Sequence, residues 1–273
     1  TPFVPLAIVG MASAMPDGAQ TPYPADRLAA VNPQVADSIT GLRGRFFDAL
    51  PCAPQAFRIP PIYDRAVSAM TLHLLCAARD AVAAGEVTLP QDTTDVVVGV
   101  CGGFDSTLRN ALKVEGIQQL SPYTQDAIAK GREKLAQIFG STTHDKVGEM
   151  GSIIAARIGL HFGTRGRVLA VENAEATLFT ALRTAALALS QGTADAVVVA
   201  VGQRFEGAHM MRALAETVPT EAGFQEGASA FIVKRLDDAR TDGNRILGVI
   251  TGLDADQSDH KQPDILAVLP DLE

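Results

Sequence analysis

The sequence predicts an α/β fold, in which a mostly parallel five-stranded sheet is covered by helices on both faces. Short apolar runs without strict alternation recur along the chain, as is typical of strands that are buried on both faces. Segments of helical period lie between them, so that strands and helices alternate and right-handed crossovers can join parallel strands. With 273 residues, of which 47% are hydrophobic, the chain can bury a substantial core.

The first expected strand covers residues 6–11 (LAIVGM), a short apolar run. Residues 16–54 are rich in Pro, Gly, Asp and Asn, and we expect loops there, with one short helix over residues 25–30. Apolar residues then recur at helical spacing over residues 64–84. Gly85 follows directly and is expected to end this helix.

A second buried strand is expected over residues 95–100 (DVVVGV). Residues 121–139 are polar and of helical period, which predicts a surface helix within an insertion. A helix rich in small residues is expected over 150–162, and a third strand over 167–171.

Residues 174–190 are apolar nearly all round, which predicts a fully buried helix. The fourth and fifth strands are expected over residues 195–201 and 228–233. The run 246–252 extends or partners the fifth strand, and residues 263–273 begin a new element.

Composition and spacing exclude several classes of function. A net charge of −8 without a basic patch argues against a nucleic-acid partner. The apolar runs are too short or too interrupted to span a bilayer, so we expect no membrane partner and a cytoplasmic location.

The cysteines and glycines indicate neither a metal nor a cofactor. Cys52, Cys76 and Cys101 form no CxxC pair, so neither a metal site nor a disulfide scaffold is expected. Cys76 lies in an apolar helical pattern and is expected to pack in the core. No glycine-rich nucleotide-binding motif is present, so no cofactor is expected.

Several segments, in the right order, resemble the N-terminal half of β-ketoacyl synthases. They are the opening strand 6–11, 57–61 (FRIPP), the helix 148–158 (GEMGSIIAARI), 192–199 (GTADAVVV), and 226–230 (EGASA) followed by 235–243 (RLDDARTDG). The FRIPP stretch is similar to ketosynthases of polyunsaturated-fatty-acid and iterative polyketide synthases. The resemblance implies the thiolase-like fold. It also implies a single domain over 1–262, with an insertion at about 104–147 and a C-terminal tail over 263–273.

The segment 171–179 (VENAEATLF) resembles the nucleophile turn of this family, which reads roughly V-D-T-A-C-S-S-S-L. The position of the nucleophilic Cys is held by Glu175. A carboxylate attacks a thioester far more weakly than a thiolate and cannot hold a stable thioester. Three roles for Glu175 stay open: a carboxylate that stabilises the start of a helix, a general acid or base, and a group that faces a partner.

The catalytic histidines of the family lie in H-G-T-G-T and N-x-G-H motifs of its second half, and neither motif is present. His73 and His161 stand in helical patterns and are expected to be packing or surface residues. The resemblance implies an acyl pocket, for which Phe104, Met150, Thr177 and Phe205 are the candidate lining residues. Core packing, or for Thr177 a bond back to a helix carbonyl, is the alternative for each.

By the same resemblance, we expect a homodimer, or a heterodimer with an active ketosynthase. Arg157, Arg165 and Arg167 are candidate contacts for an acyl carrier protein, with a solvated surface as the alternative. Three functions stay open. The chain is a non-catalytic ketosynthase-like component of a polyketide or fatty-acid synthase, or one piece of a larger β-ketoacyl synthase whose histidines lie elsewhere. The third is a hydrolase or transferase that reuses the fold, for which no coherent triad is visible.

Overall fold

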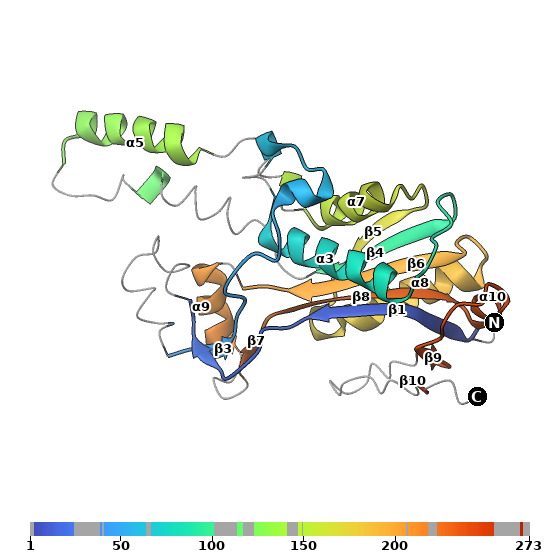
Figure 1. The fold of residues 1–273 in the computed structure, drawn as a ribbon. Helices are drawn as coiled ribbons and strands as arrows, with labels where there is room; N and C mark the ends of the chain where they lie inside the picture. Colours follow the sequence, from blue (N-terminus) through green and yellow to red (C-terminus); the bar gives the residue numbers. More distant parts are fainter. Residues whose placement is uncertain are drawn as a thin grey trace.

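A mixed seven-stranded sheet forms the body of the computed structural model (Figure 1). The structure describes residues 3–24, 39, 41–63, 67–100, 114–116, 123–140, 147–148, 150–205, 207–217, 223–253 and 268–269. Across the sheet, the strands follow the order β10 (Val268–Leu269), β9 (Gly248–Ile250), β1 (Leu6–Ala14), β8 (Gly227–Arg235), β6 (Ala196–Gln203), β4 (Thr94–Val100) and β5 (Val168–Val171). The predicted α/β class is confirmed.

The direction and number of strands differ from the expectation. Strand β4 pairs in parallel with β5 and β6, but the other four pairings, β6 with β8, β8 with β1, β1 with β9 and β9 with β10, are antiparallel. The run expected over 246–252 forms β9, which pairs with β1 and not with the fifth strand. Strand direction depends on which distant segments become neighbours, and a run buried on both faces looks the same in either direction.

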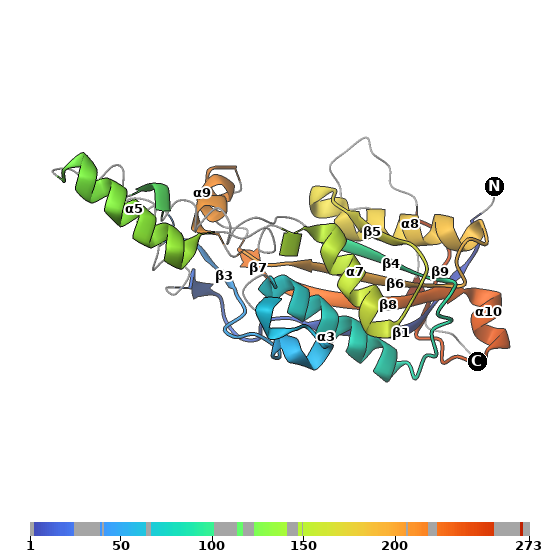
Figure 2. The same cartoon turned by 90° about the horizontal axis from the view of Figure 1, so that it is seen from above.

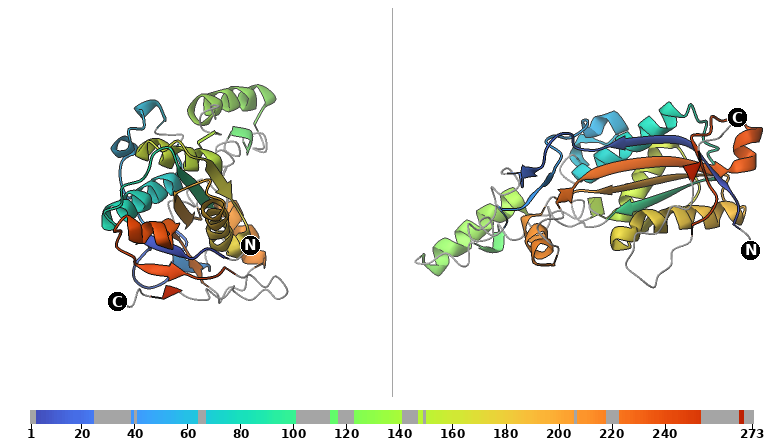
Figure 3. Two further views of the ribbon diagram at one scale, coloured as in Figure 1. Left: turned by 90° about the vertical axis from the view of Figure 1, so that its right-hand side faces the viewer. Right: turned by 90° about the horizontal axis from the view of Figure 1, so that it is seen from below.

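Helices cover both faces of the sheet (Figures 2 and 3). Helices α3 (Ala69–Ala84) and α7 (Gly151–Phe162) pack on one face, where they share a core with alternate residues of β1, β4, β6 and β8. Helix α8 (Thr177–Ser190) packs on the other face against a second core. Helix α10 (Leu236–Thr241) lies beside β1 and β8, and α5 (Gln125–Phe139) stands apart from the sheet.

Ser68 and Gly85 mark the two ends of helix α3. Its first turn is capped by the Ser68 hydroxyl, which accepts from the Thr71 amide at 3.2 Å. Gly85 follows its last turn, as expected, and a Cβ there would meet the Val9 carbonyl oxygen at 2.2 Å. Gly85 is therefore required by the close approach to β1. The helix was expected to begin at residue 64, but it begins at Ala69, because Ser68 is extended and forms its N-cap. Residues 64–66 lie outside the described residues.

A second, smaller sheet was not expected from the sequence. It joins β2 (Thr21–Pro22), β3 (Arg43–Arg45) and β7 (Phe224–Gln225). Behind it lies a third core, rich in aromatic rings, which also takes in residues of α9 (Ala208–Thr217). The sequence of 16–54 gave no period because these strands are only two or three residues long. The helix expected over 25–30 lies outside the described residues.

Helix α8 is not fully buried, contrary to the prediction. Ala181, Ala185 and Leu189 face the sheet, whereas Leu187 is 56% exposed. Apolar composition all round predicted burial on every side, but within the described chain only the sheet side is covered. No helix among the described residues is long and apolar enough to cross a membrane.

Candidate functional site

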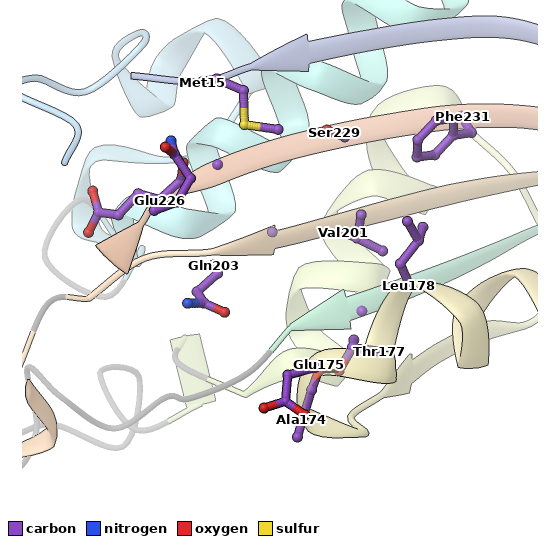
Figure 4. Close-up of a pocket in the computed structure, with 14 residues that line it drawn as sticks. Met15, Ala174, Glu175, Thr177, Leu178, Val201, Gln203, Glu226, Ser229 and Phe231 are labelled. Carbon is purple, nitrogen blue, oxygen red and sulfur yellow. Dashed lines mark hydrogen bonds between the residues drawn. The ribbon is translucent and has the colours of Figure 1, made fainter. Parts of the chain in front are cut away.

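A cavity of about 300 Å³ opens where β1 and β6 end and α8 begins (Figure 4). Its wall combines apolar side chains from β1, β6, β8 and α8 with a few polar groups. The lining residues are Met15, Gly99, Ala174, Glu175, Thr177, Leu178, Val201, Gly202, Gln203, Gln225, Glu226, Gly227, Ser229 and Phe231. Concave, largely apolar sites with a few polar groups are where proteins commonly bind small molecules.

The turn between β5 and α8 forms one wall of this cavity. A single 3₁₀ turn, η4 (Ala174–Ala176), joins the strand to the helix. Ala174 adopts a left-handed backbone with φ of 42°, which is unfavourable for a residue with a Cβ. Non-glycine residues in this conformation tend to occur at functional sites, where the surrounding structure imposes it.

Hydroxyl groups of α8 hold this turn in place. Thr177 donates to the Ala174 carbonyl at 2.7 Å and accepts from the Asn173 amide at 2.9 Å. The Asn173 side chain donates to Thr180 at 2.9 Å, and Thr184 donates to the Thr180 carbonyl at 2.7 Å. The expected bond from Thr177 to a carbonyl group therefore forms, and Thr184 makes a similar one. They fix the turn to the helix.

Close packing holds α8 against β4 at the same point. Thr177 is 7% exposed and lies over Gly99, where a Cβ would meet its Cγ2 at 2.7 Å. Glycine at this position lets the start of the helix approach the strand. The turn, the strand and the helix start are thus packed as one unit.

Glu175 is exposed and carries the one ionisable side chain of η4. Its side chain lines the cavity from the η4 side, and in Figure 4 its carboxylate lies apart from the side chains of Gln203 and Glu226. It precedes the first residue of α8 by two positions, which places it at the positive end of the helix dipole. Within the described chain, no hydrogen bond or ion pair is recorded for its carboxylate.

Glu226 shapes the opposite rim of the cavity, and sequence reasoning missed this role. The side chain is fully buried, and its two oxygens accept from the amides of Phe47 and Phe205, each at 2.7 Å. Its own amide donates to the Arg45 carbonyl at 2.9 Å. One carboxylate therefore ties three distant segments together. Its place in the EGASA motif was the available signal.

The candidate pocket residues are placed differently from one another. Thr177 lines the cavity, whereas Met150 and Phe205 lie outside its described lining. Met150 caps α7 and is 44% exposed. Phe205 is buried in the aromatic core, where the Tyr23 hydroxyl donates to its carbonyl at 2.9 Å. Phe104 lies outside the described residues. An acyl-lining role for these four residues stays a prediction.

Two of the three candidate carrier contacts already bind carboxylates of this chain. Arg167 donates twice to Asp95, at 2.7 and 2.9 Å, and Asp95 is 1% exposed. Arg165 pairs with Asp92 at 2.8 Å on the surface. Arg157 is half-buried, and burial lowers the pKa of its guanidinium, an effect that Tyr63 partly offsets.

His73 and His161 lie outside the lining of the cavity. His73 is buried in α3 and stacks on Phe47 at 3.8 Å between ring centroids. His161 lies near the end of α7, edge-on to Phe57 at 4.9 Å. Burial, with Arg79 and Arg58 nearby, lowers the pKa of His161. Both positions are consistent with packing.

Comparison with known families identifies the chain. The family model described as "Beta-ketoacyl synthase, N-terminal domain" matches residues 20–239, which is most of the sequence. The chain belongs to the β-ketoacyl synthase family. The resemblance found in the sequence motifs is thereby confirmed, and the turn before α8 corresponds to the segment that resembles the family's nucleophile turn.

Related sequences are much longer synthases. The chain is 32% identical over 120 residues to polyketide synthase GfsA of Streptomyces halstedii, covering 39% of this chain and 2% of that protein. It is 27% identical over 136 residues to a methylphloroacetophenone synthase of Cladonia uncialis, covering 45% of this chain and 5% of that protein. The chain thus corresponds to a small part of these relatives.

Solved ketosynthases share its fold. The oxazolomycin ketosynthase domain OzmH KS7 of Streptomyces albus superposes with a TM-score of 0.68 at 18% identity, over 90% of this chain and 45% of that one. The PfaC ketosynthase–chain length factor superposes with a TM-score of 0.70 at 16% identity, over 92% of this chain and 31% of that one. The predicted thiolase-like fold is therefore confirmed, and the chain spans less than half of either structure.

Proposed function

We propose that this chain is a non-condensing ketosynthase-like component of a polyketide or fatty-acid synthase, which acts through a ketosynthase or carrier-protein partner. The observation that carries the proposal is Glu175, which stands at the nucleophile position of the turn that resembles the family motif. The turn leads from β5 into the start of α8, with Ala174 in a left-handed conformation. Asn173, Ala176 and Leu178 also differ from the motif, but the change at position 175 removes the attacking thiol.

The chemistry of a carboxylate supports a non-condensing role. Condensation needs a nucleophile that holds the acyl chain as a thioester until a second substrate arrives. Attack by Glu175 on a thioester would give a mixed anhydride, which water cleaves readily. Near the malonyl substrate, the negative charge of Glu175 would also repel the malonyl carboxylate. Decarboxylation at this site is therefore disfavoured.

Two surfaces support a partner of ketosynthase type. Strand β5 ends the sheet among the described residues, and Val168 and Ala170 on it are exposed, so its backbone can pair with another strand. On the α8 face, Met11, Met15 and Leu187 are each about half exposed. Exposed apolar groups on one face often mark an interface. We propose pairing with itself or with an active ketosynthase along these surfaces.

A second candidate function is a portion of a larger β-ketoacyl synthase-type acyltransferase whose histidines lie on another half. This function is favoured by the short length of the chain relative to solved ketosynthases, of which it matches 45% and 31%. The exposed α8 face would then be covered by that other half. Glu175 weighs against condensation in this case too.

The proposal is tested by mixing the chain with the ketosynthase and the acyl carrier protein of its own source. Light scattering after size-exclusion chromatography should show a complex with one of them, and the chain alone should make no condensation product from acyl- and malonyl-carrier substrates. A condensation product from the chain alone would overturn the non-condensing role. A stable homodimer that binds neither protein would overturn the partner-dependent role.

A further inference from the structure

Two cysteine side chains from separate segments meet beside α3. The sulfur atoms of Cys52 and Cys76 lie 3.2 Å apart. Cys76 is 6% exposed within α3, and Cys52 is half-buried just before the 3₁₀ turn η1 (Pro54–Phe57). Both are free thiols. Their separation of 24 residues fits no sequence motif, which is why the sequence pointed only to packing for Cys76.

The surrounding structure keeps the two thiols together. Cys76 belongs to the main core of α3, and Cys52 packs against the same core together with Phe57 and Ile59. Figures 1 and 2 show the η1 segment lying along α3. A disulfide needs an S–S distance of about 2.05 Å. A shift of about one ångström in the irregular segment around Cys52 would therefore close the bond, while α3 stays in place.

The environment sets which thiol reacts first. Burial and the neighbouring Cys52 raise the pKa of Cys76 to about 12, although Arg79, one turn along α3, acts in the opposite direction. Cys76 therefore stays protonated near neutral pH, and the thiolate is the reactive form. Cys52 is the more accessible thiol and is the one that a small oxidant can reach.

We propose that Cys52 and Cys76 are a redox-modification site that closes into a reversible disulfide in exchange with a small disulfide such as oxidised glutathione. The Cys52 thiolate attacks one sulfur of that disulfide, forms a mixed disulfide and releases one small thiol. Cys76 then loses its proton to solvent, attacks the Cys52 sulfur and releases the second small thiol. Two protein thiols are oxidised while one small disulfide is reduced to two thiols, so atoms and electrons balance.

Closure would act on the rim of the cavity. Cys52 follows Phe47 by five residues, and the Phe47 amide donates to the buried Glu226 carboxylate that lines the cavity. A bond from Cys52 to α3 would restrict the segment that carries Phe47 and shorten the loop that must be ordered on folding. The oxidised protein should therefore melt at a higher temperature, and the amides of residues 46–57 should exchange hydrogen more slowly.

The test is intact mass after equilibration with glutathione buffers of increasing oxidised fraction, quenched in acid. The full chain should lose the mass of two hydrogen atoms, and peptide mapping should join Cys52 to Cys76. Cys101→Ser is the matched control and should keep both results. Cys52→Ser and Cys76→Ala should abolish the closed species, and circular dichroism of each variant verifies that it folds.

Three results would overturn the proposal. One is a bridge that maps to Cys101. Another is glutathione adducts that accumulate on Cys52 without closure in the folded wild-type chain. The last is a closed species that persists in Cys52→Ser. Closure of the wild type that leaves its melting temperature unchanged would keep the site and refute only its effect on stability.

Discussion

Ala174 adopts a left-handed backbone conformation directly before Glu175. A residue with a Cβ pays for this conformation in stability by roughly 1–2 kcal/mol, whereas glycine adopts it freely. The turn is therefore shaped by its surroundings, chiefly by the hydroxyl of Thr177 and the close contact with Gly99. The strained residue thus directly precedes the position at which Glu175 replaces the family's nucleophile.

Relief of this strain is measurable. Ala174→Gly should raise the free energy of unfolding by about 1 kcal/mol, because the gain at a left-handed position exceeds the entropic cost of glycine. Ala176→Gly is the control, since Ala176 has a φ of −87°, and it should lose about 0.5–1 kcal/mol. Urea denaturation compares the two variants. Equal losses in both would mean that the left-handed turn is not formed in solution.

Glu226 should matter more for stability than Glu175, although both line the cavity. Glu226→Gln keeps one acceptor but places an amide donor against a backbone amide, so the free energy of unfolding should fall by about 1–3 kcal/mol. Glu175→Gln, at an exposed position, should change it by less than about 0.5 kcal/mol. Denaturation of the two variants side by side measures the difference. An unchanged free energy of unfolding in Glu226→Gln would contradict the conclusion that this carboxylate ties three segments together.

At the scale of elements, the strands of the main sheet and the helices that cover it form where the spacing of apolar residues predicted them. The apolar runs became β1, β4, β5, β6 and β8, although β5 is partly exposed. The segments expected to be helical became α3, α5, α7 and α8. The antiparallel pairing of β8 and β9 with β1 could not be predicted from the sequence, because it depends on contacts between distant segments. The small sheet was missed because its strands are too short for a period.

Helix α7 carries a pH-sensitive residue. Burial, with Arg79 and Arg58 nearby, lowers the pKa of His161 below its ordinary value of about 6.5. The unfolded chain therefore takes up this proton at a higher pH than the folded chain. The contribution of His161 to stability is complete above about pH 6.5 and is lost as the pH falls toward the folded-state pKa.

Replacing this histidine should flatten that pH dependence. Between pH 7.5 and the onset of acid unfolding, His161→Phe should lose less stability than the wild type, since Phe fits beside Phe57 without titrating. Urea midpoints measured across this range provide the test. Identical pH profiles for the two proteins would show that His161 titrates normally in the folded state.

At the scale of the whole molecule, the two sides of the sheet differ in what is exposed. Leu187 on α8 is 56% exposed on the face where Met11 and Met15 are also exposed. Leu160, on α7 across the sheet, is 80% exposed. Burying a leucine at an interface stabilises the complex by about 1.5–3 kcal/mol. Substitutions at Leu187 and Leu160 can therefore distinguish a docking face from a leucine that is merely exposed.

We expect Leu187→Glu to weaken self-association or ketosynthase binding by at least about tenfold, which corresponds to 1.4 kcal/mol. Leu160→Glu, the matched control, should leave the affinity unchanged. Analytical ultracentrifugation over a concentration series measures both. If Leu160→Glu weakens association as much as Leu187→Glu does, the α8 face is not the interface.

Only part of the candidate site could be predicted from the sequence. The segment that resembles the nucleophile turn, with Glu175 in it, could be predicted because its residues are adjacent in the sequence. The partners of the Glu226 carboxylate, Phe47 and Phe205, come from distant segments, and their contacts arise only on folding. The sequence did not indicate partners for the candidate arginines, but Arg165 and Arg167 form ion pairs with Asp92 and Asp95.

We propose that Glu175, in place of a cysteine, is what keeps this turn from accepting an acyl group. Intact mass of the chain after incubation with an acyl-pantetheine thioester tests this most directly, with Glu175→Cys and Glu175→Gln run in parallel. We expect no adduct on the wild type or on Glu175→Gln, and one acyl adduct on Glu175→Cys that maps to position 175. An acyl adduct on wild-type Glu175, or none on a folded Glu175→Cys, would contradict it.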